Sequence, residues 1–569
     1  MKGLKTKKLI SILIVLVMSL AIMASCSTGT PTDQSPTSTP APVATDAAND
    51  DPTAIPLEEA EITFLSVWNG GGGGFPQDQI NNPVAQKIKE LTGITVKLES
   101  ITTNEAEKLN TMFASGVMPD FMNAPFWSST GGEGKIITKA ASEGQLLDLT
   151  PYLDQYPNVK KLYEIGVAKD FAEFDLGNPD FGGKTYIIPQ QTPGDNEADV
   201  TNWAYGVYAR GDILKKLGVN PADVNTSDKV YDLLVQIKEG NFVDTTGRPV
   251  IPAGTWHNGW SYGEFLGSWS DYTISDYREE NGEVINWMFS KDQEEKLIFM
   301  RKLFKDGLFD LEAFSNTDTM AKEKMAVGKI ALFGAQSGMD HFKATLYSTN
   351  PEMKYELLGP MINKSGNIKT QVEKKGRSGF PAMFLSATTE NADAVLRFLD
   401  FANSEQGWLL AQWGVEGVHY TIEDGQPKWI PEMKERLDNE VNFKRDQGIG
   451  FMGGFIGADS RPSLWPIPEE DKTQFDKWQD EYKAKLPVQF IDKVSANYLQ
   501  NDWAGLQEYR DTISTLDYEQ EFRKAIFAAT DEEAISILED IKQKYIDAGI
   551  KDLSAHVAEK ASARSDIGW

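Results

Sequence analysis

Apolar and polar positions alternate after residue 60 in an order that predicts a strand, a helix and a second strand. Residues 61–68 carry apolar side chains on both faces, as a central strand of a parallel sheet does. Asn82 provides the cap of a helix that Gly93 ends, and residues 94–98 alternate again as a strand. This order predicts a βαβ unit with parallel strands.

A second helix follows, with Asn104 as its cap and Glu107 three residues later, and it ends at Gly116. A short strand over residues 121–122 completes an α/β lobe. Ligands of such sheets bind in the loops at the carboxyl ends of the parallel strands. Three residues with side chains suited to a ligand fall on these loops: Trp68, Asn69 and Trp127.

The first 25 residues follow the three-part plan of a secretory signal peptide. Lysines precede an apolar core over residues 9–20, and small residues lead to Cys26, the only cysteine in the 569-residue chain. This ending resembles the bacterial lipobox, which implies lipidation of Cys26. A plain signal peptide with an incidental cysteine and an uncleaved anchor are the alternatives. Residues 26–56 are rich in Ser, Thr, Pro, Ala and Asp, so we expect a flexible tether there.

The composition restricts the possible functions. Removal of the signal peptide leaves about 540 residues, well beyond the roughly 250–300 at which one hydrophobic core stops growing, so we expect two or more lobes. Asp and Glu outnumber Lys and Arg by 84 to 56, and the net charge of −28 argues against nucleic-acid binding. The four histidines show no zinc-binding spacing.

Several short motifs occur in an order that is specific, although each motif alone is weak. They occupy residues 82–96, 112–120, 144–153, 183–189, 208–218, 325–332, 391–400 and 413–420. In this order they resemble the family 1 extracellular solute-binding proteins of bacterial carbohydrate ABC importers. The likeness is to the large lipoproteins of Gram-positive bacteria.

The resemblance implies an α/β fold of two lobes, a periplasmic-binding-protein-like clamp of type II that holds its ligand between the lobes. Several crossing segments form the hinge of such a clamp. We expect crossings near Pro189–Gln190, near Met325 and near Ser386–Ala387. On this division residues 57–190 and 326–387 form lobe 1, and residues 191–325 and 388–569 form lobe 2.

Sugar sites combine aromatic rings, which stack on the apolar face of a sugar, with planar polar groups that hydrogen-bond its hydroxyls. Aromatic residues concentrate in residues 203–208, 256–272 and 408–420, and core packing is the alternative for each ring. Arg377 is the expected cation if the ligand is acidic, with a solvated loop charge as its alternative. The expected ligand-binding residues are Trp68, Asn69, Trp127, Gln190, Trp203, Trp256, Trp269, Arg377, Trp413, Glu416 and Tyr420.

Some relatives within this family carry a calcium loop, and the matching stretch here covers residues 244–250. It keeps Asp244 and Gly247 but lacks the further carboxylates and amides. Calcium takes six to eight oxygen ligands. We therefore expect no bound metal and no cofactor.

The resemblance predicts a lipid-anchored, monomeric binding protein on the outer face of the membrane of a Gram-positive bacterium. It is expected to capture an oligosaccharide and deliver it to the permease subunits of an ABC importer, without enzymatic activity. A secreted glycoside hydrolase or lyase is the first alternative, because 84 acidic residues could supply a catalytic pair by chance. A peptide-binding or sensory lipoprotein is the second alternative.

Overall fold

The chain divides into two units, Met1–Pro56 and Leu57–Trp569. The computed structural model describes residues 58–67, 80–101, 105–126, 132–172, 181–199, 205–256, 259–269, 275–335, 343–368, 370–373, 380–440, 442–516 and 518–569. The expected signal peptide, Cys26 and the tether lie outside these residues. Within the described ranges, no helix is long and apolar enough to cross a membrane.

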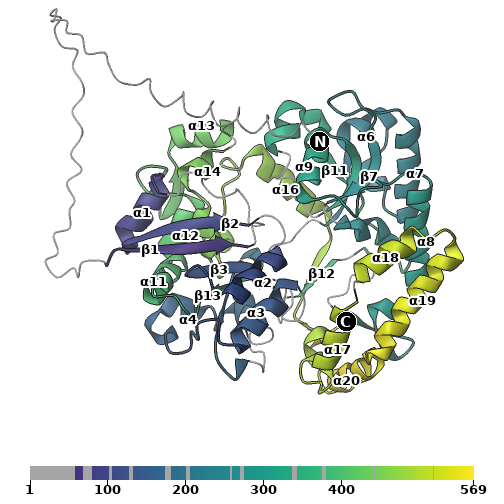
Figure 1. The fold of residues 1–569 in the computed structure, drawn as a ribbon. Helices are drawn as coiled ribbons and strands as arrows, with labels where there is room; N and C mark the ends of the chain where they lie inside the picture. The colour runs from purple at the N-terminus through teal and green to yellow at the C-terminus, as the bar shows by residue number, and fades with distance from the viewer. Residues whose placement is uncertain are drawn as a thin grey trace, which may run out of the picture. The chain divides into compact units, whose positions relative to one another are not determined.

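The first lobe is built on a five-stranded sheet with the order β2-β1-β3-β13-β4 (Figure 1). β1 pairs in parallel with β2 and β3, and β13 runs antiparallel to both β3 and β4. The strands are β1 (Ala60–Ser66), β2 (Ile94–Ser100), β3 (Phe121–Phe126), β4 (Ile187–Pro189) and β13 (Phe380–Leu385).

The predicted βαβ unit is confirmed. Helix α1 (Pro83–Thr92) joins β1 to β2, the Asn82 side chain accepts a hydrogen bond from the Ala85 N–H, and Gly93 ends the helix in the left-handed conformation. Val84 and Ile88 of α1 are buried. The second predicted helix is α2 (Glu105–Ser115), which ends before Gly116. These helices place the carboxyl ends of β1, β2 and β3 at one edge of the sheet.

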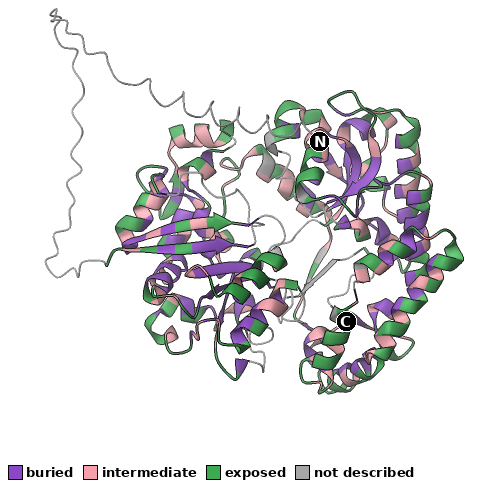
Figure 2. Ribbon diagram, in the orientation of Figure 1, coloured by how far each residue is buried: buried purple, intermediate pink, exposed green. Residues whose placement is uncertain are grey.

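Two later helices, α11 (Ala392–Ala402) and α12 (Glu405–Gln412), complete the first core. Val395, Phe398 and Leu399 of α11 are fully buried together with residues of β1 and β3. The ring of Phe455, from the short helix η11 (Phe451–Phe455), lies 4.9 Å from that of Phe398. Figure 2 shows the buried residues gathered on the strands and on the helix faces next to them.

The second lobe is built on a four-stranded sheet with the order β11-β6-β10-β7. β10 is parallel to β7 and antiparallel to β6, which is in turn antiparallel to β11. The strands are β6 (Gly206–Arg210), β7 (Ile251–Thr255), β10 (Ile330–Ala335) and β11 (Tyr355–Leu357). Its main core is closed by α6 (Gly211–Leu217), α7 (Ser227–Glu239), the short helix η7 (Tyr262–Trp269) and α8 (Gln293–Lys305).

The C-terminal helices belong to this second lobe. Helices α18 (Tyr518–Ile526) and α19 (Asp531–Asp547) contact α8, and α20 (Ile550–Ser562) follows them (Figure 1). Arg301 of α8 is buried and donates from Nη1 to the carbonyl oxygens of Ala525, Ile526 and Ala528. This guanidinium therefore satisfies the carbonyl groups at the end of α18, where a helix lacks internal donors.

The strand pairing divides the lobes differently from the sequence-based assignment. Residues 330–335, which that assignment gave to lobe 1, form β10 and pair with β6 and β7 of the second sheet. Residues 392–412, which it gave to lobe 2, form α11 and α12 in the first core. These are pairings between segments far apart in the chain, and local patterns of apolar residues carry no information on them.

The segments that cross between the lobes also differ from those expected from the sequence. The chain leaves the first sheet after Pro189, where a crossing was expected. Met325 is buried inside the second lobe beside Phe333, and Ser386 remains in the first lobe through its N–H bond to the Asp120 carbonyl. The chain returns from the second lobe to the first between Leu357 and β13. It crosses to the second lobe again between β16 (Ala458–Asp459) and α16 (Gln474–Lys485), whose Tyr482 is buried in the second lobe.

Candidate functional site

The ends of the first-lobe strands share one edge of the sheet. β1, β2, β3 and β4 end there, and the antiparallel β13 begins there, since Phe380 pairs with Phe126. Asn123 of β3 lies just inside this edge and is almost fully buried. Its Oδ1 accepts from the Val67 N–H at 3.2 Å, and its Nδ2 donates to Oε1 of Gln190 at 3.2 Å.

Gln190 follows β4 and has no exposed surface. Its Oε1 accepts from Asn123, and its Nε2 donates to the Gly454 carbonyl. Both the oxygen and the nitrogen of the Gln190 amide therefore bind protein groups. The structure places this expected ligand-binding residue where it links β3 to the segment around Gly454. The next residues continue the contact, because β5 (Thr192–Pro193) pairs with β16.

Five of the expected ligand-binding residues lie outside the described residues. Trp68 and Asn69 follow β1 in the sequence, Trp127 follows β3, and Trp203 and Arg377 precede β6 and β13. Their roles stay predictions.

The second lobe also brings strand ends together at one edge. Gly206 at the start of β6 pairs with Ala335 at the end of β10, and Thr255 at the end of β7 pairs with Gly334. A methyl group on Gly334 would overlap the carbonyl oxygen of Ser261. The glycine therefore lets residues 259–264 lie directly against the end of β10.

Two aromatic side chains are exposed at this edge. Tyr205 directly precedes β6 and is 45% exposed, and Trp260 follows β7 and is 40% exposed. Their ring centroids lie 6.2 Å apart with the planes tilted by 61°. Exposed apolar side chains that lie next to one another, unlike scattered single ones, are typical of binding surfaces. This pair offers apolar ring surface to a ligand.

Glu264 lies on η7, four residues after Trp260, with its Cβ close to Gly334 near the end of β10. Its side chain is half-buried. Burial raises the pKa of the Glu264 carboxyl to about 7, since burial disfavours the charged form. The edge thus combines two rings with one hydrogen-bonding carboxyl group.

Trp256 and Trp269 were expected at the site and are both buried. Trp256 packs in the core with Tyr208, Phe333 and residues of α16. The Trp269 indole N–H donates to Oε2 of Glu295 at 2.9 Å, and its ring lies 5.1 Å from that of Phe299 of α8. Trp269 is thus committed to packing against α8.

Trp413, Glu416 and Tyr420 occupy a tight turn of the first lobe. Trp413 is 1% exposed, and its ring lies 5.2 Å from that of Trp429 and 6.3 Å from that of Tyr420. Tyr420 is also buried, whereas Glu416 is exposed beside it. The structure therefore places the two rings in core packing, which was the alternative interpretation for each aromatic residue.

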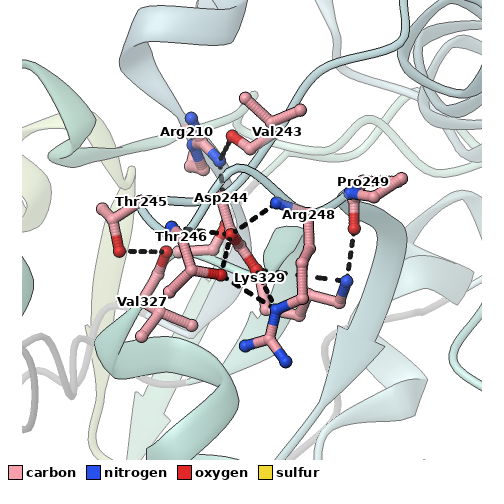
Figure 3. A network of polar contacts seen from close by, with 10 residues as sticks. Arg210, Val243, Asp244, Thr245, Thr246, Arg248, Pro249, Val327 and Lys329 are labelled. Carbon is pink, nitrogen blue, oxygen red and sulfur yellow. Dashed lines mark hydrogen bonds and ion pairs between the residues drawn. The ribbon is translucent and has the colours of Figure 1, made fainter.

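The stretch matched to a calcium loop is closed by the protein's own groups (Figure 3). Oδ1 of the buried Asp244 accepts from the Thr246 N–H, the Thr246 hydroxyl and the Arg248 N–H. Its Oδ2 faces Arg248 Nε at 3.6 Å and Lys329 Nζ at 4.0 Å. These hydrogen bonds lower the pKa of Asp244 despite its burial. Nowhere in the described ranges do three or more His, Cys, Asp or Glu side chains gather as a metal site would need.

The edge of the second sheet adds residues that the sequence analysis did not single out as ligand-binding. Tyr205 and Trp260 belong to two aromatic-rich stretches that the sequence did reveal, but nothing local separated them from the buried Trp256. Glu264 carries no sequence signal, because it is one of 84 acidic residues.

Comparisons with known proteins agree with this architecture. A family model described as bacterial extracellular solute-binding protein matches residues 76–407. The chain is similar to two proteins of Bacillus subtilis (strain 168). It is 24% identical to lipoprotein LipO over 360 residues, which are 62% of this chain and 66% of LipO, just under two thirds. It is 20% identical to the polygalacturonan/rhamnogalacturonan-binding protein YtcQ over 415 residues, which are 72% and 73% of the two chains.

Two solved structures share the fold. The S. pneumoniae substrate-binding protein FusA in complex with kestose has a TM-score of 0.61 at 17% identity, over 89% of this chain and 99% of FusA. The alginate-binding protein AlgQ2 without calcium ion has a TM-score of 0.57 at 20% identity, over 88% and 98%. These similarities confirm the two-lobed α/β fold expected from the sequence.

Proposed function

Because the chain belongs to the bacterial extracellular solute-binding proteins, we propose that it captures an oligosaccharide and delivers it to an ABC importer. The observation that carries the sugar class is the exposed pair of Tyr205 and Trp260 at the strand ends of the second sheet. Aromatic rings of this kind stack on the apolar face of a sugar ring, and neighbouring polar groups hydrogen-bond the hydroxyls. Two relatives support the class by name, since YtcQ binds polygalacturonan and rhamnogalacturonan and FusA is described with kestose.

Capture by closure of the two lobes is part of the proposal. The segments that join the sheets are paired with other short strands. β5 pairs with β16, and β12 (Thr370–Glu373) pairs with β17 (Val488–Ile491), which follows α16 of the second lobe. Several connections between two sheets suit a hinge, because the backbone angles that change on closure can be confined to them. Closure would bring residues of the first lobe into contact with the sugar bound at the edge of the second sheet.

The anchor and the partners complete the proposal. Cleavage before Cys26 and lipidation of its sulfur would hold the protein on the outer face of the cell membrane, with residues 26–56 as a tether. The protein would act as a monomer that docks on membrane permease subunits, and it would perform no covalent chemistry. Substitution of Cys26 by Ser should abolish incorporation of labelled palmitate, whereas equal labelling of the variant would exclude this anchor.

A thermal-shift screen of the purified protein against neutral and uronic oligosaccharides tests the sugar class. A ligand present at about 100 times its Kd stabilises the folded state by about 2.7 kcal/mol, which raises the melting temperature. We expect a rise with one glycan family and no change in the glycan. A rise with peptides alone would contradict the sugar class, and release of reducing ends would indicate a hydrolase.

A further inference from the structure

The second-lobe edge carries the carboxyl group of Glu264, and the role inferred for this group rests on the proposed function. We propose that Glu264 is a specificity residue that makes the site select neutral sugars over uronates. The proposal concerns the chemistry of the sugar held beside Tyr205 and Trp260. The similar proteins differ in this property, since YtcQ and AlgQ2 are named for acidic glycans and FusA is described with a neutral one.

The position of Glu264 follows from the backbone around it. Ser261 lies in the left-handed region with a φ of 68°, directly after Trp260, and Glu264 begins the hydrogen-bonded turn by donating its N–H to the Ser261 carbonyl. The close approach to Gly334 holds this turn on the end of β10. The carboxyl group is therefore fixed on the same short segment as Trp260, four residues away.

The carboxyl group of Glu264 is available to a ligand. In the part of the chain that the structure describes, no hydrogen bond or ion pair engages its side chain. The side chain is half-buried, and neither of its oxygens is among the fully buried polar atoms without a partner. Partly desolvated oxygens without a protein donor favour a ligand that brings its own donors.

Sugar hydroxyls are such donors, and a uronate carboxylate is not. An ionised Glu264 can only accept hydrogen bonds, so it pairs with the hydroxyl groups of a neutral sugar. A second carboxylate at the same place would meet a like charge in a partly desolvated setting, which disfavours binding. A cation could remove that cost, but among the residues that the structure describes no neighbouring cation lowers the pKa of Glu264, which burial raises to about 7. Arg523, from α18, instead lies over the ring of Phe314 at 5.4 Å.

The charge of the whole chain acts in the same direction. With a net charge of −28, the protein repels polyanions at a distance, which slows the encounter with an acidic oligosaccharide. Repulsion at a distance is screened by salt, whereas the effect of Glu264 at close range is not. The two contributions can therefore be separated by measuring binding at low and at high salt.

Paired probes test the proposal on the full chain by titration calorimetry. Trigalacturonate and trimannuronate are each compared with their methyl esters, which keep the rings and linkages and remove the charge. Kestose and maltotriose serve as neutral sugars without carboxyl groups. We expect the wild-type protein at pH 8 and 0.5 M salt to bind neutral probes about tenfold more tightly than acids, a ratio that corresponds to about 1.4 kcal/mol.

The variant Glu264→Gln keeps the size of the side chain and removes its charge. It should reduce the preference for the methyl ester over the acid to less than about threefold, because the amide can donate to a uronate carboxylate. Glu279→Gln, an exposed residue of β8 (Tyr277–Glu280), is the matched control and should leave the ratio unchanged. Melting temperatures of both variants report whether the fold is intact.

Three outcomes would overturn the proposal, and one of them identifies a failure of the proposed function. Tighter binding of the free acids by the wild-type protein would show an acidic cargo while leaving the oligosaccharide receptor intact. An unchanged ratio in Glu264→Gln would show that another group selects the sugar. Binding of no glycan from either class would remove the proposed function, and the inference with it.

Discussion

Two aromatic turns of the molecule look alike in the sequence and differ in the structure. Trp413 and Trp260 both sit at glycine-bounded turns, since Gly414 and Gly259 each have a φ near +80°. Trp413 is 1% exposed, while Trp260 is 40% exposed. The first ring belongs to the core of one lobe, and the second ring is exposed on the other lobe, where we propose that it contacts the ligand.

The difference comes from what covers each ring. The hairpin of β14 (Tyr420–Glu423) and β15 (Gln426–Trp429) places Tyr420 and Trp429 against Trp413. Trp260 has the exposed Tyr205 as its ring neighbour instead. An aromatic residue near a glycine is therefore not a ligand contact in itself. The ring is buried or exposed according to whether another segment of the chain packs over it.

The largest expected effect is the loss of stability on removal of the buried ring. Trp413→Ala should lower the free energy of unfolding by about 3–5 kcal/mol, because a large cavity remains in a packed core. The indole N–H of Trp413 makes no hydrogen bond among the described residues, so Trp413→Phe should cost much less. Chemical denaturation of the three proteins gives the comparison, and the Kd of folded Trp413→Ala for its glycan should match the wild type.

A lower glycan affinity of folded Trp413→Ala, with unchanged stability, would reverse the assignment. It would place this ring at the site, as the sequence analysis expected, and would contradict the burial on which the comparison rests.

The exposed ring should show the opposite behaviour. Trp260→Ala should weaken glycan binding by about 2 kcal/mol, roughly thirtyfold, as buried aromatic anchors of binding sites do. Its melting temperature should stay close to that of the wild type, since little packing is lost from a side chain that is 40% exposed. Trp260→Phe keeps a ring and should recover part of the affinity. Equal Kd values for all three proteins in calorimetry would exclude Trp260 from the site.

The sequence predicted what local signals determine. The cap of α1 at Asn82 and its end at Gly93 were predicted correctly because both depend on residues a few positions apart. The assignment of residues 330–335 and 392–412 to lobes was not, because each joins a sheet whose other strands lie far away in the chain. Tyr205 and Trp260 were not separated from the buried rings of their stretches for the same reason, since the exposure of a ring depends on which distant segments pack over it.

Each of the two turns also holds a titratable group, and burial shifts the pKa values of these groups in opposite directions. Glu264 belongs to the turn that follows the exposed Trp260. The pKa of Glu264 rises from 4.5 to about 7 on folding. Its contribution to stability is therefore present below about pH 4.5 and is lost as the pH rises through 7. The phenol of Tyr208 is the titratable group that feels its charge, and it stays neutral in this range because burial raises its pKa.

Glu264→Gln removes the loss of stability that accompanies ionisation of the Glu264 carboxyl group. The melting temperature of the variant relative to the wild type should therefore rise between pH 5 and pH 8. A constant difference over this range in differential scanning calorimetry would show that Glu264 titrates as an exposed carboxyl group does, and the edge would lose its partly desolvated acceptor.

His419 gives the buried turn the opposite pH dependence, with the smallest expected effect. Its Nδ1 accepts from the Val415 N–H at 2.9 Å, and burial and the charge of Arg436 lower its pKa, against a hydrogen bond to Gln447 that raises it. The unfolded chain thus binds the proton more readily, so stability is complete above pH 6.5 and falls as the pH drops through the lowered pKa. His419→Asn keeps an acceptor for Val415 and cannot titrate. Between pH 7 and pH 5 the wild type should lose stability relative to this variant. Parallel denaturation curves at the two pH values would mean that the turn around Trp413 opens to solvent, and the contrast between the two lobes would fail.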